Sequence, residues 1–208
     1  MFASGREGPF NLYLKSANGA GQDERLLKEG KLSVATDWTA TGDVLLYYEQ
    51  DPKTKYDLWV LPMTGERKPA VFLKTEFNER YGVFSPDGKW IAYRSDESGR
   101  YEIYVQPYPT TGAKWQVSRE GGTRPNWRRD GREIYWLEED GTLLAGEVSM
   151  GHSFQPGKAA ALFETGLTRP IERFAVTADG KRFLVPAEVD GSARPLTVVQ
   201  NWLAGARR

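Results

Sequence analysis

The side chains that could do chemistry are few in this chain, and they are not arranged in a catalytic motif. There is no cysteine, which excludes disulfides, a thiolate zinc site and a cysteine nucleophile. The one histidine, His152, excludes a metal site built from several histidines. It lies in Gly151-His152-Ser153, half of a Gly-x-Ser-x-Gly nucleophile elbow, but position 155 is Gln and no strand-to-helix turn is expected there. We therefore interpret His152 as non-catalytic.

Short acidic stretches recur along the chain. They read Glu49-Gln50-Asp51, Ser95-Asp96 before Gly99, and Glu138-Glu139-Asp140. Loops of this kind could hold a calcium ion through oxygen ligands. Short acidic side chains also accept backbone N–H groups in turns, and we favour this second interpretation. No cofactor is predicted, with calcium or another divalent metal as the alternative.

A basic cluster occurs in "RPNWRRDGR", where Arg124, Arg128, Arg129 and Arg132 flank Trp127. Arginines around an aromatic ring could form a platform for single-stranded nucleic acid. However, 28 basic residues balance 28 acidic ones, and the acidic stretch "EIYWLEED" follows directly. We interpret the cluster as a solvated turn. The zero balance also lacks the basic footprint of a duplex-binding protein and offers no attraction to an anionic membrane.

The composition predicts a globular chain, with 39% hydrophobic and 27% charged residues among 208. No apolar run is long enough to span a bilayer, so no membrane insertion is expected. The start, "MFASGREGPFNLYLKS", lacks the basic and apolar regions of a signal peptide. An export signal would therefore belong to a longer parent protein.

A five-residue turn recurs and indicates how the chain is organised. "SPDGK" (85–89) has counterparts in "TATGD" (39–43), "RRDGR" (128–132) and "TADGK" (177–181). Each turn follows an apolar residue, and these residues are Trp38, Phe84, Trp127 and Val176, at intervals of 46, 43 and 49 residues. A period in the forties is typical of propeller blades.

Four short strand patterns fill each repeat. The turn is followed by runs such as "VLLYYEQD" and "WIAYRSDESG", then by alternating runs such as "DLWVLPMTG" and "EIYVQPYPTTG", and then by weaker ones such as "AVFLKTE". These runs are rich in β-branched and aromatic residues, as strands are. We see no amphipathic helix longer than two turns. The fold class predicted is all-β, a β-propeller of about five four-stranded blades.

The units are expected at about 1–30, 31–76, 77–120, 121–166 and 167–208, as one propeller. The first unit lacks its innermost strand and the last its outer strand, which leaves three, twelve and three strands, or 18. Unpaired strand edges favour pairing between molecules. We therefore expect a fragment of a longer propeller, or a homo-oligomer formed through the incomplete terminal blades.

The third unit, "FSPDGKWIAYRSDESGRYEIYV", resembles the WD40-like repeat of TolB-type propellers. The ending "PLTVVQNWLAG" resembles the close of bacterial propellers that follow a kinase or regulator domain, although the sequence has neither a Gly-rich phosphate loop nor a His-Arg-Asp loop. The resemblance implies a sensor or scaffold region of a larger bacterial protein. That region would lie outside the cytoplasm if the parent spans a membrane.

Tryptophans occur at positions 38, 59, 90, 115, 127, 136 and 202. Such a set could stack on sugars, but most members occupy repeat-equivalent strand positions, where a ring fills the space between blades. Trp38 and Trp127 are expected to share one position, and Trp59 to share another with Tyr13 and Tyr104. Trp115, on a predicted outer strand, is the better candidate for exposure.

The innermost strands of a propeller line its channel, and their beginnings open on one face. Alignment on the turns places one position at Ala35, Tyr81, Arg124 and Arg173; the position before it at Val34, Arg80, Thr123 and Glu172; and the position nearest the turn at Asp37, Val83, Asn126 and Ala175. Polarity varies freely there, as expected where a rigid scaffold carries its site. The predicted binding residues are Asp37, Arg80, Tyr81, Arg124, Asn126, Glu172 and Arg173. The alternative, that they only hydrate the channel, stays open.

The function predicted is a non-catalytic module that binds a protein, peptide or small ligand at the channel mouth. The alternative is a metal-dependent hydrolase, in which Asp37, Asn126 and Glu172 hold a divalent metal and a bound water is the nucleophile. A third reading, the accessory propeller of a serine hydrolase, needs an α/β domain of which the sequence shows no sign.

Overall fold

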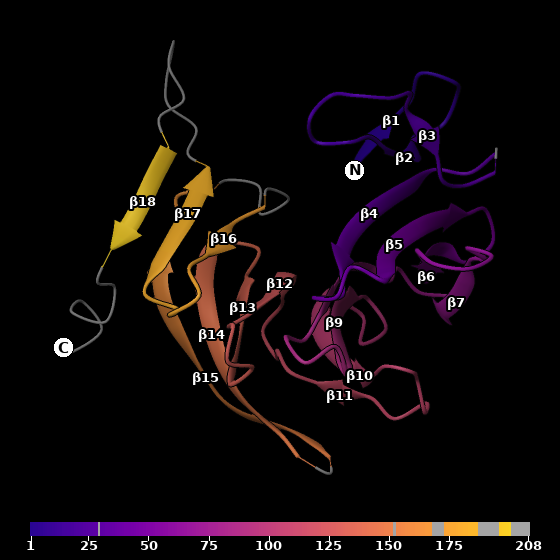
Figure 1. Ribbon diagram of the computed structural model, residues 1–208. Helices are drawn as coiled ribbons and strands as arrows, with labels where there is room; N and C mark the ends of the chain where they lie inside the picture. Colours follow the sequence, from indigo (N-terminus) through magenta and orange to yellow (C-terminus); the bar gives the residue numbers. More distant parts are fainter. Residues whose placement is uncertain (29, 152, 168–172, 187–195, 201–208) are drawn as a thin grey trace. The chain divides into compact units, whose positions relative to one another are not determined.

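The computed structural model describes residues 1–28, 30–151, 153–167 and 173–186, and the backbone of 196–200. The regular elements in these ranges are all β-strands, arranged in five sheets that follow one another along the chain (Figure 1). The described residues contain no helix, and hence none that could cross a membrane. The chain divides into two compact units, Met1–Gly82 and Val83–Arg208, with the boundary inside strand β8.

The first unit contains a three-stranded and a four-stranded sheet, each with its strands in chain order. The three-stranded sheet consists of β1 (Phe2–Ser4), β2 (Asn11–Leu14) and β3 (Glu24–Arg25). The four-stranded sheet consists of β4 (Ser33–Trp38), β5 (Val44–Asp51), β6 (Lys55–Pro62) and β7 (Ala70–Leu73).

The remaining strands form two four-stranded sheets and one three-stranded sheet. The third sheet consists of β8 (Arg80–Phe84), β9 (Trp90–Ser95), β10 (Glu102–Pro107) and β11 (Trp115–Gln116). The fourth consists of β12 (Thr123–Trp127), β13 (Glu133–Leu137), β14 (Thr142–Met150) and β15 (Phe154–Glu164). The fifth consists of β16 (Ala175–Val176), β17 (Arg182–Pro186) and β18 (Leu196–Gln200). The predicted all-β fold of about five blades, the first and last with three strands, is confirmed.

The repeated turn has the same geometry in each repeat. In the third sheet, the Gly88 N–H donates to the Ser85 carbonyl at 2.8 Å, and the Trp90 N–H donates to Ser85 Oγ at 3.0 Å. The glycine has a φ of 70°, which is why this position is Gly. The other three turns close in the same way, through the N–H groups of Gly42, Gly131 and Gly180.

An aromatic pair across two adjacent strands recurs in the first three sheets, on β1 and β2, on β5 and β6, and on β9 and β10. The pairs, with their ring-centroid separations, are Phe2–Tyr13 at 5.7 Å, Tyr47–Trp59 at 6.5 Å and Tyr93–Tyr104 at 6.0 Å. This confirms that Trp59, Tyr13 and Tyr104 share one position. In the fourth sheet, Trp136 instead faces Leu144 across the strands.

Each core lies between successive sheets because alternate residues of a strand point to opposite faces. In β13, Ile134 and Trp136 pack against the third sheet, whereas Tyr135 and Leu137 pack against the fifth. Trp38 and Trp127 end equivalent strands and pair with Leu45 and Ile134, so their predicted shared position is confirmed.

The expectation that Trp115 is the better candidate for exposure is confirmed only in part, because Trp115 is more exposed than the buried Trp90, Trp127 and Trp136 but is not fully exposed. The residue lies on the outer strand β11 as expected, but it is only partly exposed. Its ring packs against Trp90 at 5.7 Å and Phe154 at 5.8 Å. Phe154 begins the long strand β15 and covers the ring, which the sequence of β11 alone could not show.

Candidate functional site

The predicted binding residues are divided between the two units, so each unit carries its own part of the set. In the first unit, Asp37 lies in β4, and Arg80 and Tyr81 begin β8. In the second unit, Arg124 and Asn126 lie in β12 and the exposed Arg173 precedes β16. Glu172 is outside the described residues.

The backbone departs from regular strand geometry at this position of the repeat. Tyr81 and Arg124 are equivalent residues, and both have left-handed backbones, with φ of 57° and 56°. The strand register shifts at the same place, between Ala35 and Asp37 in β4 and between Thr123 and Asn126 in β12. A left-handed non-glycine residue costs roughly 1–3 kcal/mol, and such residues cluster at functional sites, although Lys55 and Arg67 of this chain show the same conformation elsewhere. Neither residue type predicts this conformation.

In the first unit, the arginine before this position stacks on tyrosine rings. The Arg80 Cζ lies 3.2 Å from the centroid of the Tyr56 ring and 5.7 Å from that of Tyr48. Tyr48 in turn meets Tyr56 and Tyr81 edge-on, at centroid separations of 5.6 and 5.9 Å. We call these four residues the Arg80 cluster. The faces of tyrosine rings attract a cation, so they hold the guanidinium in place.

Two lysines that flank this unit's four-stranded sheet are paired with carboxylates, whereas Arg80 is not. Lys31 Nζ lies 2.7 Å from Glu49, and Lys74 Nζ lies 2.8 Å from Asp51. The hydrogen bond from Lys74 lowers the pKa of Asp51, and the hydrogen bond to Glu49 raises the pKa of Lys31. Within the ranges that the structure describes, Arg80 makes no ion pair and no side-chain hydrogen bond.

The equivalent place in the second unit is built differently. Arg94, which is 7% exposed, lies over the Tyr101 ring at 3.8 Å, and its Nη1 donates to Thr123 Oγ1 at 3.2 Å. We call these three residues the Arg94 cluster. Strand pairing shows the equivalence, because Arg94 faces Ile103 as Tyr48 faces Leu58. The arginine here comes from the second strand of its own sheet.

Asn126 has a structural partner. Its Nδ2 donates to the Phe174 carbonyl at 3.1 Å, which ties β12 to the segment before β16. The predicted metal ligands Asp37, Asn126 and Glu172 remain a prediction. Among the residues that are described, no three His, Asp or Glu side chains are grouped as a metal site would need.

The acidic stretches act in their turns as the turn interpretation predicts. Asp51 Oδ1 accepts the Lys53 N–H at 2.9 Å, and Asp140 Oδ1 accepts the Thr142 N–H at 2.8 Å. The hydrogen bond from the Thr142 backbone also lowers the pKa of Asp140.

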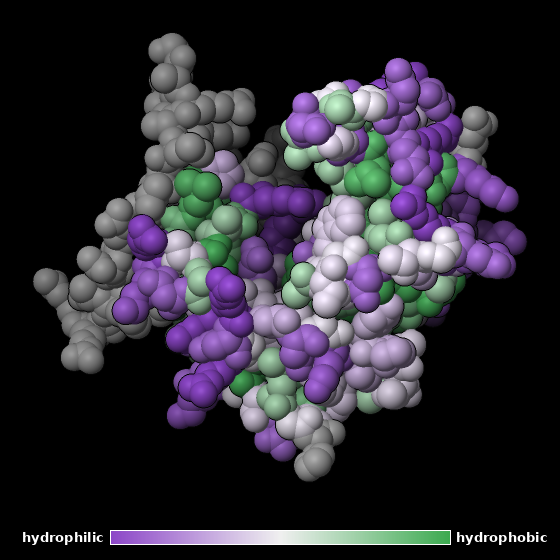
Figure 2. All heavy atoms as spheres, in the orientation of Figure 1, coloured by the Kyte–Doolittle hydropathy of each residue, from purple (hydrophilic) through white to green (hydrophobic). Residues whose placement is uncertain are grey.

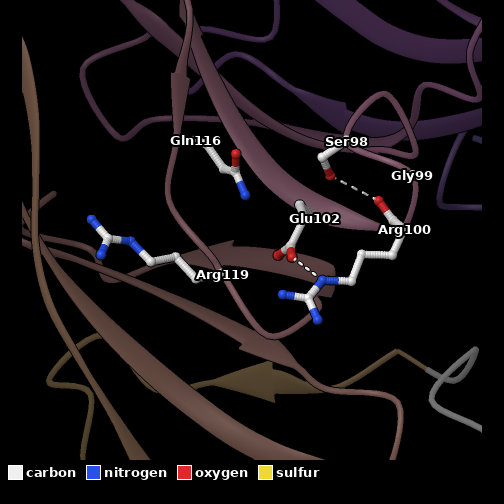
Figure 3. A pocket seen from close by; sticks show the side chains of 6 residues that line it. All are labelled: Ser98, Gly99, Arg100, Glu102, Gln116 and Arg119. Carbon is white, nitrogen blue, oxygen red and sulfur yellow. Dashed lines mark hydrogen bonds and ion pairs between the residues drawn. The ribbon is translucent and has the colours of Figure 1, made fainter.

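A shallow pocket of about 390 Å³ in the second unit is lined by Ser98, Gly99, Arg100, Glu102, Gln116 and Arg119 (Figure 3). Glu102 lies between Arg100 and Gln116, while the Arg119 guanidinium points away from it. The Glu102 carboxylate is buried and accepts the Arg100 Nε–H at 2.7 Å, the Gly121 N–H at 3.2 Å and the Ser118 hydroxyl. These bonds fix the loop that leads to β12. Glu102 is therefore structural.

A second pocket of about 310 Å³ is mainly apolar. It is lined by Ala175, Val176, Thr177, Arg182, Phe183 and Leu184, where apolar side chains reach the surface over β16 and β17 (Figure 2). Leu184 is 40% exposed. The lining contains no carboxylate, histidine or amine that could act as an acid or base.

No protein-family model matches the sequence, and no curated protein matches it either. Solved structures do match, and they are β-propellers. TolB from Acinetobacter baumannii aligns over 96% of this chain and 48% of its own, with a TM-score of 0.72 and 15% identity. A putative TolB from Agrobacterium tumefaciens aligns over 77% and 59%, with a TM-score of 0.65 and 17% identity. A structure of a nidogen/laminin complex aligns over 84% and 63%, with a TM-score of 0.60 and 16% identity.

The structure thus defines a β-propeller with incomplete first and last blades. More particularly, its fold is the TolB-like propeller that the repeat "SPDGKWIAYRSD" indicated. The chain spans about half of one TolB structure and three fifths of the other.

Proposed function

We propose that this chain is a non-catalytic binding module. It takes a protein, peptide or small ligand through side chains at the beginnings of its first strands, which are β4 and β8 for the first unit and β12 and β16 for the second, each unit with its own part of the set. One observation carries the proposal. The walls of the sheets repeat the same turns and aromatic pairs, whereas the residues that begin the first strands combine variable side chains with left-handed backbones at Tyr81 and Arg124.

Strain of this kind favours a binding role because strained backbones cluster where a protein holds a ligand. A bulge turns side chains out of the strand's regular alternation, and rigid neighbours must hold it there. Gly82 shows how tight this support is, because a Cβ on it would lie 2.8 Å from the Leu46 side chain. The sheet therefore holds Tyr81 in place from the adjacent position.

The fold alone does not separate binding from catalysis, because one fold hosts many functions. Enzymes are among the solved propellers that the chain resembles. A hydrolase with a divalent metal on Asp37, Asn126 and Glu172 is therefore the competing outcome of the test, with calcium or another metal as its cofactor.

We further propose that the module is the sensor or scaffold part of a larger bacterial protein. The likeness to proteins of greater length supports this proposal. Strands β1 and β18 each lie at the edge of a three-stranded sheet and could pair with a second copy. Light scattering after size exclusion tests this association, and a stable monomer would overturn it.

The binding role is tested by selecting a ligand from a random peptide library against the full chain. Fluorescence polarisation then measures the affinity of the ligand for Tyr81→Ala, Arg124→Ala and the control Arg129→Ala. The control removes the charge of an exposed arginine that lies outside the predicted site. We expect a loss of about tenfold or more in the first two and little change in the control. Equal affinity in all three would overturn the proposal.

The competing reading is tested on the same protein. One divalent metal per chain, together with activated-ester hydrolysis that EDTA abolishes, would favour the hydrolase.

A further inference from the structure

We propose that the Arg80 cluster binds a carboxylate, such as an acidic side chain of a peptide. This inference rests on the proposed binding function and names the chemistry of one contact within it. It is carried by an arginine that the protein orients but does not neutralise.

The rings fix the orientation of the guanidinium. With the Arg80 Cζ at 3.2 Å from the Tyr56 centroid, the ring face covers one side of the group. The Nε is buried and has no hydrogen-bond partner. The side chain as a whole is only half-buried. With the ring on its face and its Nε enclosed, the guanidinium can offer a ligand its two Nη groups, which form a fork that matches a carboxylate.

The surrounding charges leave Arg80 without compensation. The carboxylates nearest in sequence to the tyrosines have other partners: Glu49 pairs with Lys31, and Asp57 accepts the Thr54 hydroxyl at 2.7 Å. Glu79, the residue before Arg80, is buried and accepts the Thr75 hydroxyl. A partly desolvated cation without an anion is unfavourable, and a ligand carboxylate would remove that penalty.

The tyrosine rings favour an acidic side chain over a free phosphate. Glu49, Asp57 and Glu79 place negative charge in the sequence next to Tyr48, Tyr56 and Arg80. Charge alone does not separate the two ligands, because the attraction of a dianionic phosphate to Arg80 and its repulsion by these carboxylates are both about twice those of a singly charged carboxylate. The two tyrosine rings also offer apolar contact to the methylene groups of an acidic side chain.

The Arg94 cluster does not present a carboxylate-binding arginine in the same way. Arg94 is 7% exposed, and its Nη1 is already bonded to Thr123. The arginine of the second unit is therefore enclosed and hydrogen-bonded, whereas the arginine of the first unit is half-buried and has no acceptor among the described residues.

The test uses the full chain and a fluorescein-labelled hexaglutamate peptide with an amidated C-terminus, at fixed ionic strength. Hexaglutamine with an amidated terminus is the neutral control, and hexaglutamine with a free terminus separates an α-carboxylate from an acidic side chain. Inorganic phosphate and acetate serve as competitors. The variants are Arg80→Gln, Arg80→Lys and, as the matched loss of one exposed charge, Arg129→Gln.

We expect hexaglutamate to bind more tightly than amidated hexaglutamine, and Arg80→Gln to weaken hexaglutamate about tenfold. Arg80→Lys keeps the charge but loses the fork, so it should weaken binding by an intermediate factor. Arg129→Gln should change little. Tighter binding of the free-terminus hexaglutamine would assign the α-carboxylate as the ligand group and support the same chemistry.

Equal losses in Arg80→Gln and Arg129→Gln would overturn the inference, because they would indicate unspecific attraction. Stronger competition by phosphate than by acetate would overturn it as well. If Arg80→Gln unfolds, Arg80→Lys alone decides. The two proposals can fail independently. A library-selected ligand that depends on Arg124, combined with equal losses in Arg80→Gln and Arg129→Gln, would support the proposed function and overturn this inference.

Discussion

The Arg80 and Arg94 clusters occupy the same place in successive repeats but use opposite arrangements. In both, a guanidinium lies over a tyrosine at the start of the third strand: Tyr56 is the second residue of β6, and Tyr101 directly precedes β10. In the first unit the arginine is Arg80, which begins β8, the first strand of the following sheet. In the second unit it is Arg94, which lies in β9, the second strand of the same sheet as Tyr101. Both repeats therefore place an arginine on this tyrosine, although the arginine comes from a different strand in each.

This difference distinguishes the packing of an arginine on a tyrosine ring from the availability of its charge to a ligand. Arg94 is nearly enclosed and donates to Thr123, so it acts as a packing residue with a satisfied end. Arg80 has the same stacking but no acceptor within the described part of the chain. A repeat protein can vary one such position for binding because its other blades preserve the fold.

The largest effect is expected at the carboxylate after the tyrosine in the second unit. Glu102→Ala removes the acceptor of Arg100, Ser118 and the Gly121 N–H. We expect a loss of about 3 kcal/mol in the free energy of unfolding, because several donors lose a buried partner. Urea unfolding measures it. The control is Glu120→Ala, whose exposed pair with Arg100 should contribute under about 1 kcal/mol. Equal losses would show that the buried network is not the cause.

The next effect compares the two arginines directly. Arg94→Ala should lower the free energy of unfolding by about 2 kcal/mol, since it removes ring packing and leaves Thr123 without its donor. Arg80→Ala should cost less than about 1 kcal/mol, because only the stack is lost. Chemical denaturation of both variants checks this difference. A loss at Arg80 as large as that at Arg94 would mean that both clusters are structural.

The sequence could predict much of this fold because the repeats are visible in it. Turn glycines such as Gly88 and the aromatic positions of Tyr13, Trp59 and Tyr104 recur at fixed offsets, and a turn or ring has one effective place in a blade. The partial cover of Trp115 could not be predicted, because Phe154 comes from a strand nearly forty residues later. Long-range packing of this kind leaves no local signal.

The candidate site was only partly predictable. Arg80 and Tyr81 followed from alignment on the turns, but Tyr48 and Tyr56 did not, because strand pairing and not sequence spacing brings them to Arg80. A signal existed in "YDLWV" and "YEIYV", which place a tyrosine before each buried acid. The left-handed backbones of Tyr81 and Arg124 had no such signal, since neither residue type favours them.

Transplanting the open cluster would sharpen the comparison. The double substitution Arg94→Tyr and Thr123→Arg gives the second unit three of the four side chains of the Arg80 cluster at equivalent positions, with Arg124 in the place of Tyr81. If position alone decides accessibility, the stoichiometry of hexaglutamate binding should rise from one to two per chain, at about the same affinity. Isothermal titration calorimetry measures the ratio, with Arg94→Tyr alone as the control. An unchanged ratio in a folded double variant would show that these substitutions are not enough to make an accessible arginine in the second unit.

The smallest effect concerns pH and contrasts carboxylates of the two units. The Lys74 hydrogen bond lowers the pKa of Asp51, so its contribution to stability is present above the ordinary carboxyl pKa and is lost as pH falls through the lowered one. Burial, followed by the charges of Asp140, Glu120 and Glu102, raises the pKa of Glu138, so its ionised form disfavours folding at neutral pH. Asp51→Asn should therefore lower the melting temperature at pH 7, while Glu138→Gln should raise it slightly. Both differences should shrink near pH ~3, where carboxyls in the unfolded chain are mostly protonated. Thermal unfolding at the two pH values checks this, and differences that do not depend on pH would mean that packing rather than charge governs both positions.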